Sequence, residues 1–253
     1  MSSDPPVGGT ESLARAWRAA AHAAVCDVIA PWAHGTVVRA TRYPSYFDFN
    51  LVRVETPVGI GVQELAAFAD EALAGLAHRR MDFDLVEDAD ARRAGFEALG
   101  WNAMRLLWLR HEGAAPAASG AEVVEVPYEA VQDLRVVWMR EEGQPATPGY
   151  FEQAREVALL RGARVFAALE DDVPVAFAQL ERHGAGAEIT QVFVNADRRA
   201  AGRGTAMTCA AIAAAGDVRD LWIVADDGDR AKDLYARLGF RPAWLSMQLT
   251  RLP

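Results

Sequence analysis

Apolar positions along the chain change period repeatedly, and each change predicts a switch between helix and strand. In the N-terminal half, a helical period runs from Leu13 to Ile29 and again from Val62 to Leu76. Between them, the short runs Thr36 to Arg39 and Phe47 to Val54 are rich in β-branched and aromatic residues and favour strands. This alternation predicts a mixed α/β fold for the first half of the chain.

The C-terminal half shows a clearer succession of elements. Two helical periods come first, from Tyr128 to Glu142 and from Tyr150 to Arg161. Strand patterns follow, and an alanine-rich helical stretch precedes the last of them. A central mixed β-sheet flanked by helices is therefore expected here as well. The expected strands are Arg164 to Ala168, Val175 to Glu181, Glu188 to Val194 and Leu221 to Ala225.

Each half ends in a similar stretch, Leu85 to Trp101 in the first and Val224 to Phe240 in the second. Both predict a strand, an acidic loop and a short helix that stops at Leu-Gly-aromatic, where glycine supplies the left-handed cap. An internal duplication explains this likeness, and a chance similarity between two short αβ turns is the alternative. Aligned without gaps, the stretches match Asp88 with Asp227, Asp90 with Asp229, Phe96 with Tyr235, Gly100 with Gly239 and Trp101 with Phe240.

A segment of small residues divides the chain near its middle. The residues from Gly113 to Ala121 include four alanines before Ala121, two glycines, one proline and one serine, a composition typical of a flexible linker. We therefore expect an N-terminal domain of residues 1–112, a linker of residues 113–121 and a C-terminal domain of residues 122–253.

The composition narrows the class of protein. With 51% hydrophobic and 24% charged residues, the chain of 253 residues has the balance of an ordinary globular protein. No apolar run is long enough for a membrane span, and a net charge of −9 disfavours nucleic acids and anionic membranes. The two cysteines argue against a disulfide framework and favour the cytoplasm. The five histidines lack metal-ligand spacing, so no metal is expected.

The most informative chemistry lies in the turn from Arg199 to Ala206, which follows an apolar strand and opens a helix. Glycines allow backbone N–H groups to approach an anion closely, and the helix N-terminus adds partial positive charge. Arg199 and Arg203 add full charges and forked donors that suit a diphosphate. The turn therefore predicts a nucleotide-like cofactor that carries a pyrophosphate.

This turn and a second motif together resemble the GNAT superfamily of N-acetyltransferases. Arg199, Gly202 and Gly204 match the family's first signature, an Arg or Gln followed by two spaced glycines. The stretch Leu234-Tyr-Ala-Arg-Leu-Gly-Phe240 matches the second signature, which lies thirty-odd residues further on. The resemblance covers about residues 122–253. The first half is similar to a degenerate copy, as in tandem members of the mycothiol synthase type, which implies two GNAT-like domains.

The resemblance also implies acetyl-CoA as co-substrate and an amine as acceptor. In the family, the backbone of the fourth strand binds the pantetheine arm, and amides at the start of the next helix bind the pyrophosphate. Tyr235 would protonate the departing thiolate as a general acid, and a packed core aromatic is the alternative for this residue. The cofactor-binding residues so implied are Val192, Phe193, Val194, Arg199, Ala200, Ala201, Gly202, Arg203, Gly204 and Thr205.

Glu188 resembles the base glutamate of histone-type members, because it lies at the start of the fourth strand. The alternatives are a solvated carboxylate at a strand end, or a water chain that takes the amine proton instead. Glu141 and Glu142 lie in a region that walls the acceptor pocket in the family. One family residue is missing, since Gly228 stands in place of an Asn that belongs to the second motif.

The first half lacks the chemistry of the second. Its counterpart of the glycine turn, Thr56 to Gly61, contains no arginine, and Phe96 stands where a tyrosine would donate a proton. We therefore expect no catalysis there. The sequence leaves three functions open, namely an acetyltransferase, a non-catalytic acyl-CoA-binding sensor or structural module, and a scaffold for a protein partner. It also leaves open whether the acceptor is a small-molecule or a protein amine, and whether the protein is a monomer or a homodimer.

Overall fold

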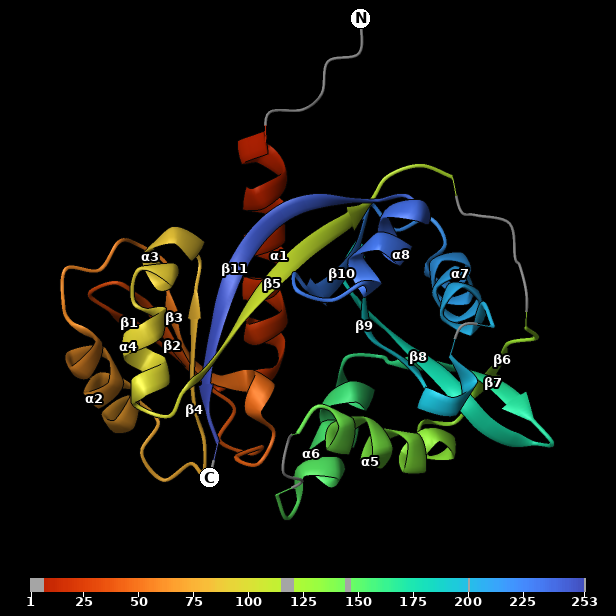
Figure 1. Ribbon diagram of the computed structural model, residues 1–253, viewed down its shortest axis with the longest axis horizontal. Coiled ribbons are helices and arrows are strands. Elements are labelled where there is room, and N and C mark those ends of the chain that lie inside the picture. The colour runs from red at the N-terminus through yellow and green to blue at the C-terminus, as the bar shows by residue number, and fades with distance from the viewer. Residues whose placement is uncertain (1–6, 115–120, 144–146, 200, 253) are drawn as a thin grey trace, which may run out of the picture.

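The computed structural model describes residues 7–114, 121–143, 147–199 and 201–252. The eleven strands within these ranges join one mixed sheet in the order β1-β2-β3-β4-β11-β5-β10-β9-β8-β7-β6. Helices cover parts of both faces, and the two halves of the chain lie on either side of the long strands β5 and β11 (Figure 1). The expected class, a mixed α/β fold with two similar halves, is confirmed.

The elements of the N-terminal half run from a long helix to a long strand. They are α1 (Val7–Val25), β1 (Val28–Trp32), β2 (Gly35–Arg39), the 3-10 turn η1 (Phe47–Phe49), β3 (Asn50–Val54), α2 (Val62–Ala72), β4 (Arg79–Phe83), α3 (Val86–Asp90), α4 (Arg93–Ala98) and β5 (Asn102–His111).

The elements of the C-terminal half follow the predicted order. They are β6 (Val124–Val126), η2 (Tyr128–Val131), α5 (Gln132–Glu141), α6 (Tyr150–Leu160), β7 (Arg164–Glu170), β8 (Val173–His183), β9 (Gly186–Val194), η3 (Ala196–Arg198), α7 (Arg203–Ala215), β10 (Asp220–Asp226), α8 (Ala231–Arg237) and β11 (Phe240–Arg251).

Four predicted boundaries in the first half are wrong. Helix α1 begins at Val7 rather than Leu13, and α2 ends at Ala72 rather than Leu76. The other two are the end of α1 and the start of β3. Helix α1 ends at Val25, and Ile29 lies in strand β1, because the carboxylate of Asp27 accepts the backbone N–H of Thr41 at 2.7 Å and the chain then pairs with β2. Phe47–Phe49 form a 3-10 turn rather than the start of a strand. The errors at the end of α1 and at the start of β3 have one cause. An apolar run does not show by itself at which residue a strand begins to pair with its neighbour.

The two halves exchange their last strands at the centre of the sheet. Strand β5 follows α4 but pairs antiparallel with β10 of the C-terminal half. Strand β11 follows α8 but pairs antiparallel with β4 of the N-terminal half. The parallel pair β3–β4 in the first half has its counterpart in the parallel pair β9–β10 in the second. The topology of the two halves therefore repeats. The stretch from Leu85 to Trp101 differs from its prediction, because β4 ends at Phe83 and the acidic residues form helix α3.

Because β5 and β11 are exchanged, a cut of the chain near its middle does not yield two complete sheets. Residues 115–120 of the predicted linker lie outside the described residues, so the division at residues 113–121 stays a prediction. Strands β5 and β11 pair with each other from Phe240 with His111 to Thr250 with Asn102. Each half of the sequence therefore completes the sheet of the other half.

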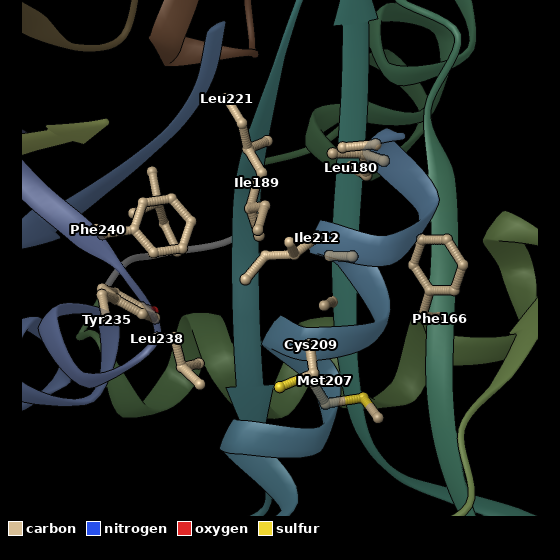
Figure 2. Packing of buried hydrophobic residues seen from close by; sticks show 14 of the residues in the cluster. Phe166, Leu180, Ile189, Met207, Cys209, Ile212, Leu221, Tyr235, Leu238 and Phe240 are labelled. Atoms are coloured by element: carbon tan, nitrogen blue, oxygen red, sulfur yellow. The ribbon is translucent and has the colours of Figure 1, made fainter. Parts of the chain in front are cut away.

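The hydrophobic core of each half contains side chains of the strand that comes from the other half. Met247 and Leu249 of β11 are buried in the core of the N-terminal half, together with residues of β3, α2 and β4. Leu109 of β5 is buried in the core under α7, where Met207, Cys209 and Ile212 of α7 face strands β8 and β9 (Figure 2). Neither half can therefore bury its own apolar face without a strand from the other.

Two helices on the opposite face of the sheet also join the halves. Helix α1 packs on β11 and brings Trp17 into a cluster with Trp108, Trp222 and Trp244. Helix α6 contributes Ala154 and Val157 to a core whose other buried members come from the N-terminal half. The central face of the sheet is thus enclosed by elements of both halves.

Leu249→Ala is expected to lower the free energy of unfolding by about 2–5 kcal/mol, because it leaves a cavity in a closed core. Leu249 is fully buried in the N-terminal core although it lies near the C-terminus. Urea denaturation measures the change, and Leu160→Ala, at a side chain 58% exposed, serves as the control with a change within about 0.5 kcal/mol. A separate early transition of the first half alone would contradict the coupling of the halves.

Candidate functional site

Strands β9 and β10 part from each other within the sheet. Their parallel pairing begins at Asp220 with Gly186 and ends at Ile223 with Ile189, although β9 continues to Val194 and β10 to Asp226. Beyond that point β9 pairs with β8, and β10 pairs with β5. The backbone edges that these two strand ends turn toward each other are thus left unpaired.

A β-bulge in β9 accompanies the split. Gln179 of β8 pairs with Gln191, and Leu180 pairs with Ile189, so Thr190 is an extra residue in the ladder. The bulge reverses which side chains share a face, since Ile189 and Val192 both pack toward the α7 core. Val194 packs on that core as well, whereas Phe193 is buried on the α5 side. The three residues expected to bind pantetheine therefore follow the bulge directly.

The predicted glycine turn opens helix α7 beside this split. Gly202 is the N-cap residue with φ 75° and ψ 1°, a left-handed conformation that glycine adopts without strain, and a Cβ there would meet open space. A Cβ on Gly204 would lie 3.4 Å from Leu234 of α8, so this glycine lets α8 pack closely on α7. Ala201 and Thr205 lie in the same turn, and Ala200 is outside the described residues.

The arginines of the turn already have acidic partners. Arg199 pairs with Glu141, its side chain is 54% exposed, and its Nε donates to the carbonyl oxygen of Val194 at 3.0 Å. Arg203 pairs with Glu170 and donates to the carbonyl oxygen of Arg198 at 3.0 Å. An incoming diphosphate would therefore exchange with these carboxylates. Glu141, which the resemblance implies to lie near the acceptor, contacts the glycine turn through Arg199.

Tyr235 is buried where α8 packs on the sheet. Its ring meets that of Phe240 edge to face, with 6.1 Å between the centroids, and Leu238 belongs to the same core (Figure 2). Burial raises the pKa of the phenol above its usual value, so the hydroxyl stays protonated at neutral pH. The hydroxyl donates to no other group among the described residues. The arrangement suits a proton donor, and it is also that of a core aromatic.

The position of the missing Asn is filled by a local turn. The backbone N–H of Gly228 donates to Asp226 Oδ1 at 2.7 Å, and a Cβ there would lie 3.2 Å from that oxygen. Asp227 pairs with Lys232 at 2.9 Å, and Asp229 accepts the N–H of Arg230. Both neighbouring carboxylates therefore already make local contacts.

A cavity of about 220 Å³ lies on the α1 side of the sheet, between the halves. Glu188 lines it, whereas Tyr235 and the glycine turn do not. The N-terminal half contributes Arg18, Ala21 and His22 of α1, Tyr46, Asp48 and Phe49 at η1, Arg80 and Asp82 of β4, and Leu106 and Trp108 of β5. The C-terminal half contributes Trp138, Tyr150, Arg161, Glu181, Glu188, Thr190, Gln191, Val224 and Ser246.

Two glutamates face each other in this cavity across strands β8 and β9. Glu181 and Glu188 are register partners, and Arg161 lies 2.6 Å from Glu181 Oε2 and 4.0 Å from Glu188 Oε2. Burial raises the pKa of Glu181 to about 7, the neighbouring Glu188 raises it as well, and Arg161 opposes both. Glu181 accepts a hydrogen bond from Gln179 Nε2 at 2.7 Å. It is thus a second candidate base.

Sequence reasoning missed Glu181 because it ends an apolar strand pattern and belongs to no motif. The hairpin between β8 and β9 carries a usable signal, since Gly186 pairs with His183 and this register places Glu181 opposite Glu188. The cavity residues of the first half carried no such signal. They lie on α1, η1, β4 and β5, in segments that contain no recognisable motif.

The remaining charges of the cavity are paired. Arg80 binds Asp48 at 2.6 Å and Asp82 at 2.9 Å. Arg18 binds Asp84, which lies outside the cavity lining, at 2.6 Å. Burial, together with the charges of Arg18 and nearby arginines, lowers the pKa of His22 well below its usual value, so the imidazole is neutral. The acidic side chains of the cavity therefore outnumber the guanidinium groups that are available to neutralise them.

The N-terminal half has no equivalent of the split. Strands β3 and β4 stay paired to their ends, Val54 with Phe83. Gly61, the N-cap residue of α2, has φ −78°, and its N–H donates to Glu64 Oε2 at 3.0 Å. A carboxylate of the chain thus occupies the place that an anion would take at this helix end. Phe96 is fully buried.

Within the described residues, no group of three or more His, Cys, Asp or Glu side chains is placed to hold a metal ion. None of the helices that the structure describes is long and apolar enough to cross a membrane.

Residues 128–240 match the profile of the acetyltransferase (GNAT) family. A comparison with curated proteins gives no match. Among solved structures, a functionally unknown conserved protein from Staphylococcus epidermidis ATCC 12228 is similar, with 14% identity over 90% of this chain and 94% of that chain and a TM-score of 0.65.

Two further solved structures with similar folds are named as GCN5-related N-acetyltransferases. The one from Kribbella flavida has 15% identity over 96% of this chain and 95% of its own, with a TM-score of 0.58. The one from Sphaerobacter thermophilus has 14% identity over 75% of this chain and 67% of its own, with a TM-score of 0.52. At these identities the likenesses show the fold.

Glu181→Gln is expected to remove a pH dependence of stability. With a pKa raised from 4.5 to about 7, the folded state binds the proton more tightly, so the stabilisation is complete below about pH 4.5 and is lost as pH passes about 7. Urea denaturation across this range measures the slope. Glu125→Gln is the control, at an exposed glutamate paired with Arg164. It should leave the slope between about pH 5 and 7 unchanged, because the hydrogen bond from Arg164 lowers the pKa of Glu125. An unchanged slope in Glu181→Gln would contradict the assignment.

Proposed function

We propose that the protein is an acetyltransferase that acetylates a small amine, because residues 128–240 match the profile of the acetyltransferase (GNAT) family. Acetyl-CoA is the proposed acetyl donor, bound on the α7 side of the sheet. The amine is proposed to bind in the cavity on the α1 side. The observation that carries the proposal is the parting of β9 and β10 next to a helix that opens on Gly202.

The residues of this region fit acetyl-CoA. The unpaired edge of β9 from Val192 to Val194 offers backbone groups to the amides of a pantetheine arm, as an added strand would. The start of α7, with Gly202 open to solvent at its Cβ position, offers N–H groups and partial positive charge to a pyrophosphate. When bound, acetyl-CoA supplies an activated acetyl thioester.

Two side chains are proposed to handle the protons of the reaction. Glu188, on the cavity wall, takes the proton that the amine nitrogen must lose, with Glu181 beside it as a second acceptor. Tyr235 gives its hydroxyl proton to the leaving sulfur, which its raised pKa permits because the phenol is protonated at neutral pH. Glu188 lies on β9, and Tyr235 lies on α8, which packs against α7.

The cavity favours a small cationic amine over a protein substrate. Its volume of about 220 Å³ suits a small molecule, and Tyr46, Phe49, Trp108, Trp138 and Tyr150 supply aromatic faces that attract cations. Asp48, Asp82 and Glu188 exceed the two guanidinium groups left to balance them even when Glu181 is protonated, because Arg18 is already held by Asp84. An ammonium group is therefore electrostatically favoured in this space.

A non-catalytic acyl-CoA sensor is the second candidate function. The replacement of the family Asn by Gly228 favours it, since the neighbouring Asp227 and Asp229 are held in other contacts. Thiol release from acetyl-CoA with a panel of small amines separates the two functions. Tight acetyl-CoA binding without thiol release with any amine would support the sensor.

Gly202→Glu is expected to weaken acetyl-CoA binding by about 100-fold or more, because a carboxylate at the helix start repels a pyrophosphate. Titration calorimetry measures the affinity. Gly75→Glu is the matched control: Gly75 also has a positive φ, 83°, and open space at its Cβ, so the substitution brings the same backbone strain far from the split. Equal affinities for the two variants would refute the binding site.

Tyr235→Phe is expected to lower kcat by about 100-fold or more while sparing acetyl-CoA affinity, since the variant keeps the ring and loses the proton donor. Thiol release gives kcat, and calorimetry gives the affinity. Tyr43→Phe, at another buried tyrosine in the N-terminal half, is the control. A Tyr235→Phe variant with full turnover would leave only the packing role for this residue.

A further inference from the structure

The indole of Trp17 reaches from the first half of the chain to a proposed catalytic group of the second. Its Nε1–H donates to Glu188 Oε2 at 2.7 Å, although 171 positions separate the two residues. Trp17 is 8% exposed, and the Glu188 side chain is 14% exposed. The hydrogen bond is therefore largely shielded from water, where a contact with a charged acceptor is strong.

Strand β9 is shaped to receive this indole. Gly186 lies two residues before Glu188, and a Cβ on it would come within 2.5 Å of Trp17 Cζ3 and 2.9 Å of Cε3. Real Cβ atoms do not approach so closely, so a glycine is needed for the ring to lie against the strand. The ring of His183 meets Trp17 edge to face at 6.4 Å. Gly186 and His183 thus fix the position of the indole, and in this position its N–H donates to Glu188.

Glu188 has few other strong partners. Arg161 Nη2 lies 4.0 Å from it, beyond hydrogen-bond distance. Trp222 of β10 is its register partner on the other side. The charged or titratable groups that line the cavity with Glu188 are Arg18 and His22 of α1, Asp48 at η1, Arg80 and Asp82 of β4, Arg161 after α6 and Glu181 of β8. The neighbouring strands also carry Arg110 of β5, His183 of β8 and Asp220 of β10 outside that lining.

We propose that Trp17 is a positioning residue for Glu188, whose carboxylate it holds at the cavity wall with one oxygen left to accept a proton. The inference rests on the proposed function, in which Glu188 takes the proton of the amine. A donor to the carboxylate favours its charged form and fixes the direction of its free oxygen. The N-terminal half then contributes a side chain to the proposed reaction.

Trp17→Phe keeps a ring against Gly186 but removes the N–H. We expect kcat/KM for the amine to fall roughly 10- to 100-fold, since a displacement of about 1 Å can cost about 100-fold. The acid limb of the profile of kcat/KM against pH moves to higher pH, and acetyl-CoA affinity is unchanged. A purely structural role for Trp17 would lower activity without moving that limb.

Trp244→Phe is the matched control. Trp244 belongs to the same aromatic cluster, and its Nε1–H donates to the carbonyl oxygen of Asp84 at 3.0 Å, so the variant loses a comparable hydrogen bond away from Glu188. We expect its acid limb to stay at the wild-type pH. Equal shifts in both tryptophan variants would overturn the proposal.

Gly186→Ala is a second variant that disturbs the contact between Trp17 and Glu188, in this case by a change on strand β9. The added methyl group displaces the indole and is expected to move the acid limb as Trp17→Phe does, and the double variant should show no further shift. Independent, additive shifts would overturn the proposal. This second variant also keeps the test available if Trp17→Phe folds poorly.

The hydrogen bond itself is tested without turnover. The indole N–H signal of Trp17, identified in ¹H–¹⁵N spectra by its loss in Trp17→Phe, should move with pH, and Glu188→Gln should abolish that movement. An indole signal insensitive to Glu188→Gln refutes the positioning role. A wild-type protein that binds acetyl-CoA, shows the indole response and releases no thiol with any amine refutes the proposed function while upholding the contact.

Discussion

The antiparallel pairing of β5 with β11 at the centre of the sheet is the constraint on which the other features depend. Each strand leaves its own half and closes the sheet of the other, so the ladder between them joins two incomplete sheets into one. Apolar side chains from each strand then fill the core of the opposite half. Because burial of these side chains is the main driving force for folding, the halves stabilise each other.

This joining also sets the shape of the proposed active site. With β5 and β11 between β4 and β10, helix α1 crosses the middle of the sheet and packs on β11, and α6 packs on the first half. The cavity lies in the space that these helices leave above the central strands. Its walls consequently carry residues of both halves, and the proposed proton acceptor on β9 shares the cavity with groups from α1 and β4.

The two halves share a topology but differ at the place where a cofactor would bind. In the second half, a bulge at Thr190 and the early end of the β9–β10 pairing leave backbone groups unpaired beside the start of α7. In the first half, β3 and β4 stay paired to their ends, and Glu64 caps the corresponding helix. Unpaired backbone polar groups are costly unless a ligand or water satisfies them, which is why the cofactor site is proposed in the second half.

Local patterns in the sequence determined the fold class, the order of elements in the second half and the glycine turn at Gly202, because these depend on residues a few positions apart. The exchange of β5 and β11, the start of β1 at Val28, the pairing of Glu181 with Glu188 and the contact of Trp17 with Glu188 were decided only in the tertiary structure. Register and packing bring these distant groups together. A carboxylate such as Glu181 acquires its altered pKa only when the surrounding chain has removed it from water.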